Sequence, residues 1–194
     1  MNMTNIFRPN TNTIAYSAIL SSLYLILSYI TSYAIGPQIR GIDAHFWRAM
    51  LMTILAMRLR VIGGPSLMGV ISGFLLLAVP SSTSFLYLHS SILCGITYDL
   101  IMKSSYNNSR IKRSIIITSS IISGLVESVS VLIGLFIFGF PFNILLGRLE
   151  LIGMASPIGI FIYGISKNVI MSGLGAFTAI FIISRINPKL IKDN

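Results

Sequence analysis

The sequence predicts an all-α integral membrane bundle of about six transmembrane helices, with both termini in the cytoplasm. Three observations predict it. Of the 194 residues, 54% are hydrophobic and only 10% are charged, whereas a soluble domain carries about a quarter charged residues. Apolar runs near the roughly 20 residues that a bilayer crossing needs recur along the chain, and the basic residues lie between them. We therefore expect residues 1–194 to form a single transmembrane domain in the cell membrane.

Each predicted helix is an apolar run bounded by charge, glycine or proline. Gly63, Gly64 and Pro65 separate the second run from the third, and Pro80 ends the third because a helix interior does not continue through proline. The second and third runs are shorter than a full crossing, so a buried or re-entrant hairpin is the alternative to two crossings. The six predicted helices cover residues 14–34, 44–59, 65–79, 84–102, 114–138 and 157–186.

The positions of lysine and arginine predict the orientation. With the first helix starting inside, ten basic residues fall on cytoplasmic segments and three on external segments, which is the bias of the positive-inside rule. Lys167 falls inside the last helix. The cytoplasmic set is Arg8, Arg58, Arg60, Lys103, Arg110, Lys112, Arg113, Arg185, Lys189 and Lys192, and the external set is Arg40, Arg48 and Arg148.

Several classes of function find no support in the residues. The basic residues form no continuous patch with interleaved aromatics, so no nucleic-acid partner is expected. Cys94 is the only cysteine, which excludes an intrachain disulfide and a cysteine-based metal cluster. No hydrolase or phosphate-binding motif occurs, and five acidic residues supply acid and base chemistry poorly. We expect no catalytic residues, no metal site and no cofactor in this chain.

Small residues at a spacing of four predict close helix packing. In the first helix, Ala15, Ala18 and Ser22 are the candidate docking face for a partner membrane protein, with packing inside the bundle as the alternative. The same two interpretations apply to the other such motifs, which are Ser17 with Ser21, Gly69 with Gly73, Ser172 with Ala176, and Gly175 with Ala179.

Polar residues inside predicted membrane helices indicate a functional site, because a charge in the hydrocarbon region is costly. Glu127 and Lys167 could neutralise each other as a buried ion pair, or could take part in a site. Asp99 and Lys103 are spaced as a helix-surface ion pair, and Arg148 with Glu150 could be a solvated loop pair. Trp47 and Tyr163 offer aromatic surface for stacking. The candidate substrate-binding residues are Trp47, His89, Glu127, Tyr163, Lys167 and Asn168, gathered toward the external side.

These features resemble the substrate-binding S component of energy-coupling factor (ECF) transporters. The segment joining helices 2 and 3 in YkoE-like members is similar to three stretches of this chain, Phe46–Arg48, Ala56–Arg60 and Gly63–Gly69. Their Gly-x-x-x-acidic stretch is similar to Cys94–Leu100, with Asp99 as the acid. The resemblance implies uptake of a vitamin or vitamin precursor, thiamine or hydroxymethylpyrimidine among them. It also implies a transmembrane coupling subunit and two ATPase subunits as partners.

Two other functions stay open. The chain could be a self-sufficient small transporter or channel, with Glu127 and Lys167 as a proton or ion relay, or it could be a membrane-embedded enzyme.

Overall fold

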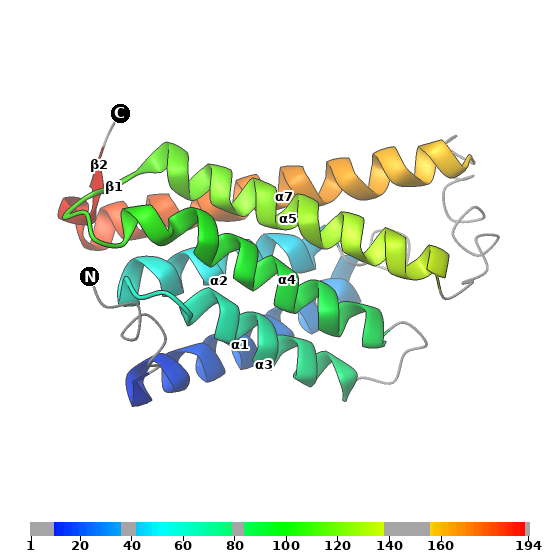
Figure 1. Cartoon of the computed structure of the whole chain (residues 1–194), viewed down its shortest axis with the longest axis horizontal. Helices are drawn as coiled ribbons and strands as arrows, with labels where there is room; N and C mark the ends of the chain where they lie inside the picture. Colours follow the sequence, from blue (N-terminus) through cyan, green and yellow to red (C-terminus); the bar gives the residue numbers. More distant parts are fainter. Residues whose placement is uncertain (1–9, 36–41, 79–83, 138–155, 193–194) are drawn as a thin grey trace.

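The structure, a computed structural model, describes residues 10–35, 42–78, 84–137 and 156–192, and six α-helices account for most of them (Figure 1). The helices are α1 (Thr11–Ile35), α2 (Ile42–Leu59), α3 (Gly64–Leu77), α4 (Ser84–Met102), α5 (Arg113–Ile137) and α7 (Pro157–Ile186). Two short 3-10 turns, η2 (Lys103–Ser105) and η3 (Pro188–Leu190), and two short strands, β1 (Ile111–Lys112) and β2 (Ile191–Lys192), complete the described elements. The all-α prediction is confirmed, and each predicted helix boundary lies within three residues of the observed one.

The turn between α2 and α3 is determined by local sequence. Gly63 adopts a φ of 103°, a left-handed conformation that residues with a Cβ rarely take. Pro65 lies in the first turn of α3, where its missing N–H costs nothing because that N–H would have no partner in the helix. The chain therefore reverses directly from α2 into α3.

Asp99, on α4, caps the amino end of α3. Its carboxylate accepts hydrogen bonds from the backbone N–H groups of Gly63 at 3.1 Å and Ser66 at 2.8 Å, and from the Ser66 hydroxyl at 2.6 Å. The Tyr106 hydroxyl donates to its other oxygen at 2.8 Å. The predicted surface ion pair with Lys103 is wrong, because Asp99 is only 2% exposed and faces α3 rather than the helix surface. The first backbone N–H groups of a helix have no acceptor within the helix, so a carboxylate at the start of α3 is stabilising.

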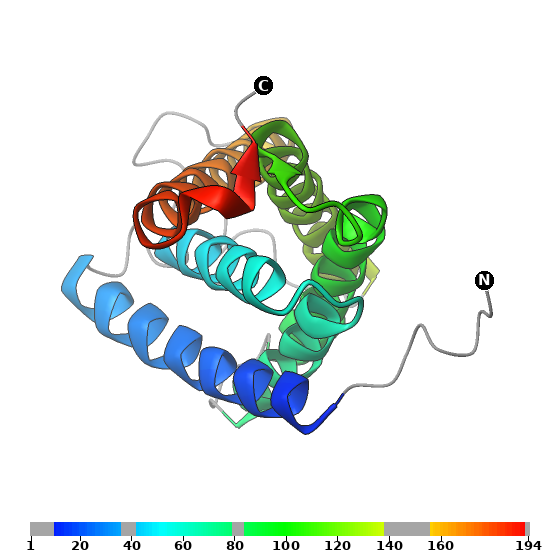
Figure 2. The same ribbon diagram turned by 90° about the vertical axis from the view of Figure 1, so that its left-hand side faces the viewer.

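The helices form a closed ring in the order α1, α3, α4, α5, α7, α2, with each packed against the next. Helix α2 also contacts α3 and α5, so it lies inward of the others. Figure 2 looks along the bundle and shows α2 between α1 on one side and α7 on the other. The buried polar side chains of α2, Asp43, Arg48 and Thr53, therefore contact neighbouring helices.

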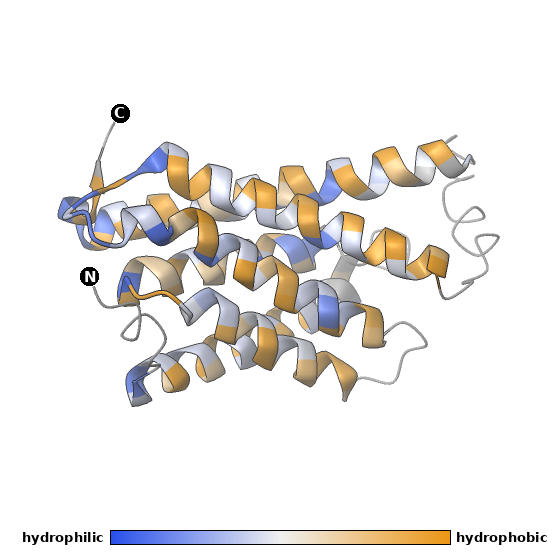
Figure 3. Cartoon of the chain, in the orientation of Figure 1, coloured by the Kyte–Doolittle hydropathy of each residue, from blue (hydrophilic) through white to orange (hydrophobic). Residues whose placement is uncertain are grey.

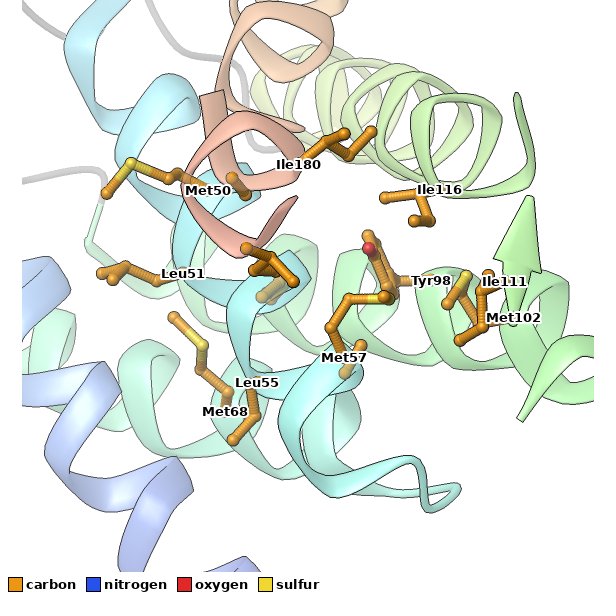
Figure 4. Close-up of a cluster of buried hydrophobic side chains, with 14 of the residues drawn as sticks. Met50, Leu51, Leu55, Met57, Met68, Tyr98, Met102, Ile111, Ile116 and Ile180 are labelled. Carbon is orange, nitrogen blue, oxygen red and sulfur yellow. The ribbon is translucent and has the colours of Figure 1, made fainter. Parts of the chain in front are cut away.

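The main hydrophobic core surrounds the second half of α2. All six helices contribute side chains that are at most 9% exposed, with Tyr24 coming from α1. The residues labelled in Figure 4 come from the other five helices and from β1, namely Met50, Leu51, Leu55, Met57, Met68, Tyr98, Met102, Ile111, Ile116 and Ile180. Within this core the hydroxyls of Thr53 and Tyr98 share a hydrogen bond of 3.0 Å. Thr53 also lies 3.4 Å from the hydroxyl of Ser120. These three buried hydroxyls thus satisfy one another.

Four described helices are long and apolar enough to cross a membrane, namely α1, α4, α5 and α7, and α3 is a shorter apolar helix of 14 residues. Large apolar side chains are exposed along their outer faces, among them Ile26, Leu100, Ile133 and Phe177. A soluble monomer rarely exposes so much contiguous apolar surface. The prediction of a helical membrane protein agrees with these features.

One end of the bundle gathers the basic residues. The first turn of α1, the α2–α3 turn, the α4–α5 connection and the end of α7 all lie on the left of Figure 1. In Figure 3 the hydrophilic colour is concentrated at this end. We call it the basic end; the described basic residues there are Arg58, Arg60, Lys103, Arg110, Lys112, Arg113, Arg185, Lys189 and Lys192. The start of α1 and β2 share this end.

Most small-residue motifs serve packing inside the bundle. A Cβ on Gly69 would meet the backbone of Ser91 on α4, and one on Gly175 would meet the backbone of Phe46 on α2. Ser17 and Ser21, both fully buried, donate to the carbonyls of Gly64 and Met68 on α3 at 3.2 Å. Close backbone approach of this kind is what small residues allow between membrane helices.

Candidate functional site

Glu127, on α5, lies at the centre of a buried polar cluster in the half of the bundle away from the basic end. It is 2% exposed and forms an ion pair with Arg48 of α2, which is 3% exposed. His45, one turn earlier on α2, places Nδ1 at 3.2 Å from the second carboxylate oxygen. A buried carboxylate needs such partners, because desolvation of an isolated charge is costly.

This pairing corrects two predictions. The interpretation that Glu127 pairs with Lys167 is wrong, because both carboxylate oxygens are occupied by residues of α2. Arg48 was assigned to an external segment, and that is also wrong, because α2 begins at Ile42 and turns Arg48 into the bundle. The partner of the buried acid therefore comes from the inner helix rather than from α7.

Arg48 extends the cluster to α1. Its Nη2 donates to the Tyr24 hydroxyl at 2.6 Å, and its guanidinium carbon lies 4.8 Å from the centre of the Tyr24 ring. Tyr24 is 2% exposed, so the pair is held away from solvent. The Nε of Arg48 has no hydrogen-bond partner among the described residues. One donor of the guanidinium thus remains available inside the bundle.

A second group of polar residues joins the first turns of α2 to the end of α1. Thr31 donates to the carboxylate of Asp43, which is 5% exposed. The indole Nε1 of Trp47 donates to the Thr31 hydroxyl at 3.2 Å, and the Trp47 ring packs edge-on against Phe46 with ring centres 5.0 Å apart. Trp47, which directly precedes Arg48 in α2, is therefore held in one orientation.

Asn168, on α7, completes the cluster next to Glu127. Its Nδ2 donates to the hydroxyl of Ser128 at 2.7 Å, and Asn168 is 6% exposed. Its Oδ1 is buried and has no partner among the described residues. Buried polar atoms in folded proteins are nearly always hydrogen-bonded, so an unpaired acceptor and an unpaired donor in one cluster call for an explanation.

Lys167 and Tyr163 lie on α7 next to this cluster. The Nζ of Lys167 lies 5.8 Å from the centre of the Tyr163 ring, within the range of a cation–π contact. The charge of Asp43 also acts on Lys167. Five of the six predicted substrate-binding residues therefore lie on the facing helices α2, α5 and α7. They are Trp47, Glu127, Tyr163, Lys167 and Asn168.

His89 is placed apart from the other predicted residues. Its Nε2 lies 3.3 Å from the carbonyl oxygen of Ser130, on α5. It lines a mainly apolar groove between α4 and α5, with Leu93, Val129 and Ile133 among its neighbours. Glu127 is absent from the lining of that groove. The structure does not bring His89 together with the buried cluster.

Sequence reasoning left Tyr24, Thr31 and His45 out of the candidate site. A signal for the first existed, because Ser17, Ser21 and Tyr24 recur at steps of four and three along α1. That spacing puts polar groups on the one face of α1 that is buried. The possible loop pair of Arg148 and Glu150 lies outside the described residues.

No group of three or more His, Cys, Asp or Glu side chains that could hold a metal occurs among the described residues. Comparison with known proteins finds no matching family model, no matching curated protein and no matching solved structure. The arrangement of the buried cluster is therefore the basis for a functional interpretation.

Proposed function

We propose that this chain is a membrane subunit that captures a small polar solute in the buried cluster, as the substrate-binding component of an ECF-type importer. One observation carries the proposal. The Nε donor of Arg48, which pairs with Glu127, and the Oδ1 acceptor of Asn168, which bonds Ser128 next to Glu127 in sequence, are both buried and have no partner among the described residues. Leaving each such atom without a partner costs about 1–3 kcal/mol. A bound solute with a matching acceptor and donor would recover that energy.

The charges of the cluster favour a solute of low net charge. Arg48 pairs with Glu127, and Asp43 acts on Lys167, so acids and bases balance within the site. A strongly charged solute would leave one charge uncompensated in a low-dielectric environment. A heteroaromatic vitamin or precursor, such as thiamine's hydroxymethylpyrimidine part, has the required donors and acceptors on a flat ring.

Aromatic side chains border the cluster from two helices. Trp47 projects from α2 and Tyr163 from α7, and both are half-buried. Stacking on such rings contributes binding area, while the few buried polar atoms provide discrimination between solutes. This division of roles fits a capture protein, which must bind tightly without chemical change of its ligand.

Energy for uptake would come from partner subunits, since the sequence contains no nucleotide-binding motif. We place the docking face on α1, where Ala15 and Ser22 are exposed and Ala18 is half-buried. The neighbouring face of α1 is occupied, because Ser17 and Ser21 bond to α3. A second membrane helix could therefore approach α1 closely from outside the bundle.

Calorimetric titration tests the ligand site. Thiamine, hydroxymethylpyrimidine, riboflavin and biotin are titrated into the purified protein, and the solute that binds is then titrated into Asn168→Ala. The expected loss of affinity is about tenfold or more, the value of one hydrogen bond to a buried partner. The matched control is Thr178→Ala on the same helix, whose hydroxyl only donates to the Leu174 carbonyl within α7. A stable Asn168→Ala protein with unchanged affinity would show that the site lies elsewhere.

Co-purification tests the docking face. Ala18→Trp should abolish capture of the transmembrane coupling subunit while solute binding is retained, because the added ring blocks backbone approach. The control is Leu174→Trp, a bulky change on an outward-facing residue of α7 that is 50% exposed. Loss of solute binding with retained capture would identify this face of α1 as internal packing. Transport by the purified chain alone would favour a self-sufficient transporter.

A further inference from the structure

The outer face of α7 carries a continuous apolar stripe that leads to a basic residue. Ile170, Leu174, Phe177 and Phe181 are 50% to 62% exposed and follow one another at steps of four, three and four. This spacing keeps them on one face of the helix. The next step of four along the same face is Arg185, in the last turn of α7. The stripe and the arginine therefore form one surface that is apolar along its length and cationic at its end.

Arg185 is held against the end of this stripe. Its guanidinium carbon lies 5.1 Å from the centre of the Phe181 ring, a cation–π geometry. The charged group itself thus lies over the last ring of the stripe. An anion bound to this guanidinium would therefore have apolar surface directly beside it.

A second exposed cation is fixed next to the end of α7. Lys189 lies in η3, which follows α7 after a single residue. This turn is tied to the bundle because Arg60 donates to the carbonyl of Leu190 at 3.3 Å and to those of Asn108 and Ser109 at 3.2 Å and 3.0 Å. The side chain of Ile191, 6% exposed, packs into the main core. Lys189 is therefore held by a folded segment.

Few acids balance these charges. Among the described residues, the acid at the basic end is Asp99, and its carboxylate is buried and bonded to Gly63, Ser66 and Tyr106. Exposed cations there include Arg58, Lys103, Arg110 and Lys112. Figure 3 shows this concentration of hydrophilic residues beside the apolar outer helices. The surface around Arg185 thus attracts anions.

We propose that the end of α7 binds an anionic phospholipid, with the phosphate at Arg185 and Lys189 and an acyl chain along the Leu174, Phe177 and Phe181 stripe. Charge alone would suit any anion, but the stripe directly below the arginine matches a molecule with an acidic head and an apolar tail. Basic residues next to membrane helices recognise acidic lipids in this manner. The solute site is separate, because the buried cluster lies in the other half of the bundle.

Native mass spectrometry of the detergent-purified full chain tests the proposal, with phosphatidylglycerol and phosphatidylcholine of equal chain length as probes. Phosphatidylglycerol should bind about tenfold more tightly than phosphatidylcholine. Arg185→Gln should weaken phosphatidylglycerol binding about fivefold, the effect of one basic residue near an acidic lipid. Phe181→Ala, which retains the charge, should weaken binding of the same lipid as well.

The matched control is Arg58→Gln, which removes the same charge at the same end. Arg58 ends α2, where the residues one turn earlier, Ile54 and Leu55, are half-buried or buried and offer no lipid-facing stripe. Its affinity for phosphatidylglycerol should change less than twofold. Equal losses in Arg58→Gln and Arg185→Gln would overturn the proposal in favour of diffuse charge attraction. Displacement of the lipid by millimolar inorganic phosphate would overturn it in favour of an anion site without a role for the acyl chain.

Discussion

Removal of Glu127 should destabilise the bundle more than removal of Glu127 and Arg48 together. In Glu127→Gln, the guanidinium of Arg48, which is 3% exposed, loses its charged partner and keeps its contacts with the Tyr24 hydroxyl and ring. Two unit charges at about 4 Å attract by about 4 kcal/mol at the effective dielectric constant of about 20 that suits proteins. Breaking a buried ion pair from one side costs about 3–5 kcal/mol in measured cases. We expect a loss of unfolding free energy in this range for Glu127→Gln and for Arg48→Met.

The double variant Arg48→Met with Glu127→Met should cost less than either single variant, because two apolar side chains of similar size leave no unpaired charge. The free energy of unfolding in detergent can be followed by alkylation of Cys94, which is the single cysteine and is 3% exposed. The thiol becomes reactive as the bundle opens. The coupling of these two residues would be refuted if the loss of unfolding free energy in the double variant equalled the sum of the losses in the two single variants. It would also be refuted if each single variant lost less than about 1 kcal/mol.

The other predictions concern helix packing, capping and orientation. Asp99→Asn should cost about 2 kcal/mol of unfolding free energy, because the start of α3 loses a charged cap, and an unchanged midpoint of denaturation would contradict the capping role. Gly69→Leu should prevent folding or cost several kcal/mol, since its Cβ meets the Ser91 backbone. The control Gly164→Ala has nothing within 4 Å of the new Cβ and should be neutral or stabilising by up to about 1 kcal/mol. Equal effects of the two variants on thermal stability would argue against close packing of α3 on α4 at Gly69. Tyr98→Phe should cost about 1 kcal/mol through loss of the Thr53 hydrogen bond, measured by the same denaturation, and no loss would show that this bond contributes nothing. A cysteine at Asn107, in a Cys94-free variant, should react only with reagents applied from the cytoplasm, and labelling from outside would reverse the orientation.

The helices could be predicted from sequence because their signals are local. The apolar runs, Gly63, Pro65 and the basic residues between runs determine where each helix starts and ends. The same charges determine which helix ends gather at the basic end. These signals act within a few residues of the feature that they predict, so one sequence is enough to read them.

The partners inside the bundle could not be predicted in the same way. Glu127 pairs with Arg48 rather than with Lys167 because of the rotation of α2, α5 and α7 about their own axes. This rotation depends on packing between helices. In an almost wholly apolar helix, hydrophobic periodicity does not define one inward face. The partner of Asp99 could not be predicted either, because Ser66 is 33 residues away in the sequence.

Polar residues give the better guide to rotation in such helices. Ser17, Ser21 and Tyr24 mark the buried face of α1, because a polar group in hydrocarbon finds its hydrogen bonds inside the bundle. The same reasoning applied to α2 would have placed Asp43 and Arg48 inward. Stripes of polar residues therefore predict helix orientation in this chain where stripes of apolar residues do not.

The fluorescence of Trp47 provides the most direct test of solute capture in the buried cluster. It is the only tryptophan, and its indole Nε1 donates to Thr31, which also bonds Asp43. The whole tryptophan signal therefore comes from the border of the proposed site. Titration with the four vitamins and precursors should give a saturable change for one of them in the wild-type protein, and a midpoint about tenfold higher in Asn168→Ala. A folded wild-type protein whose tryptophan emission stays unchanged by a solute that calorimetry shows to bind would contradict capture at this cluster.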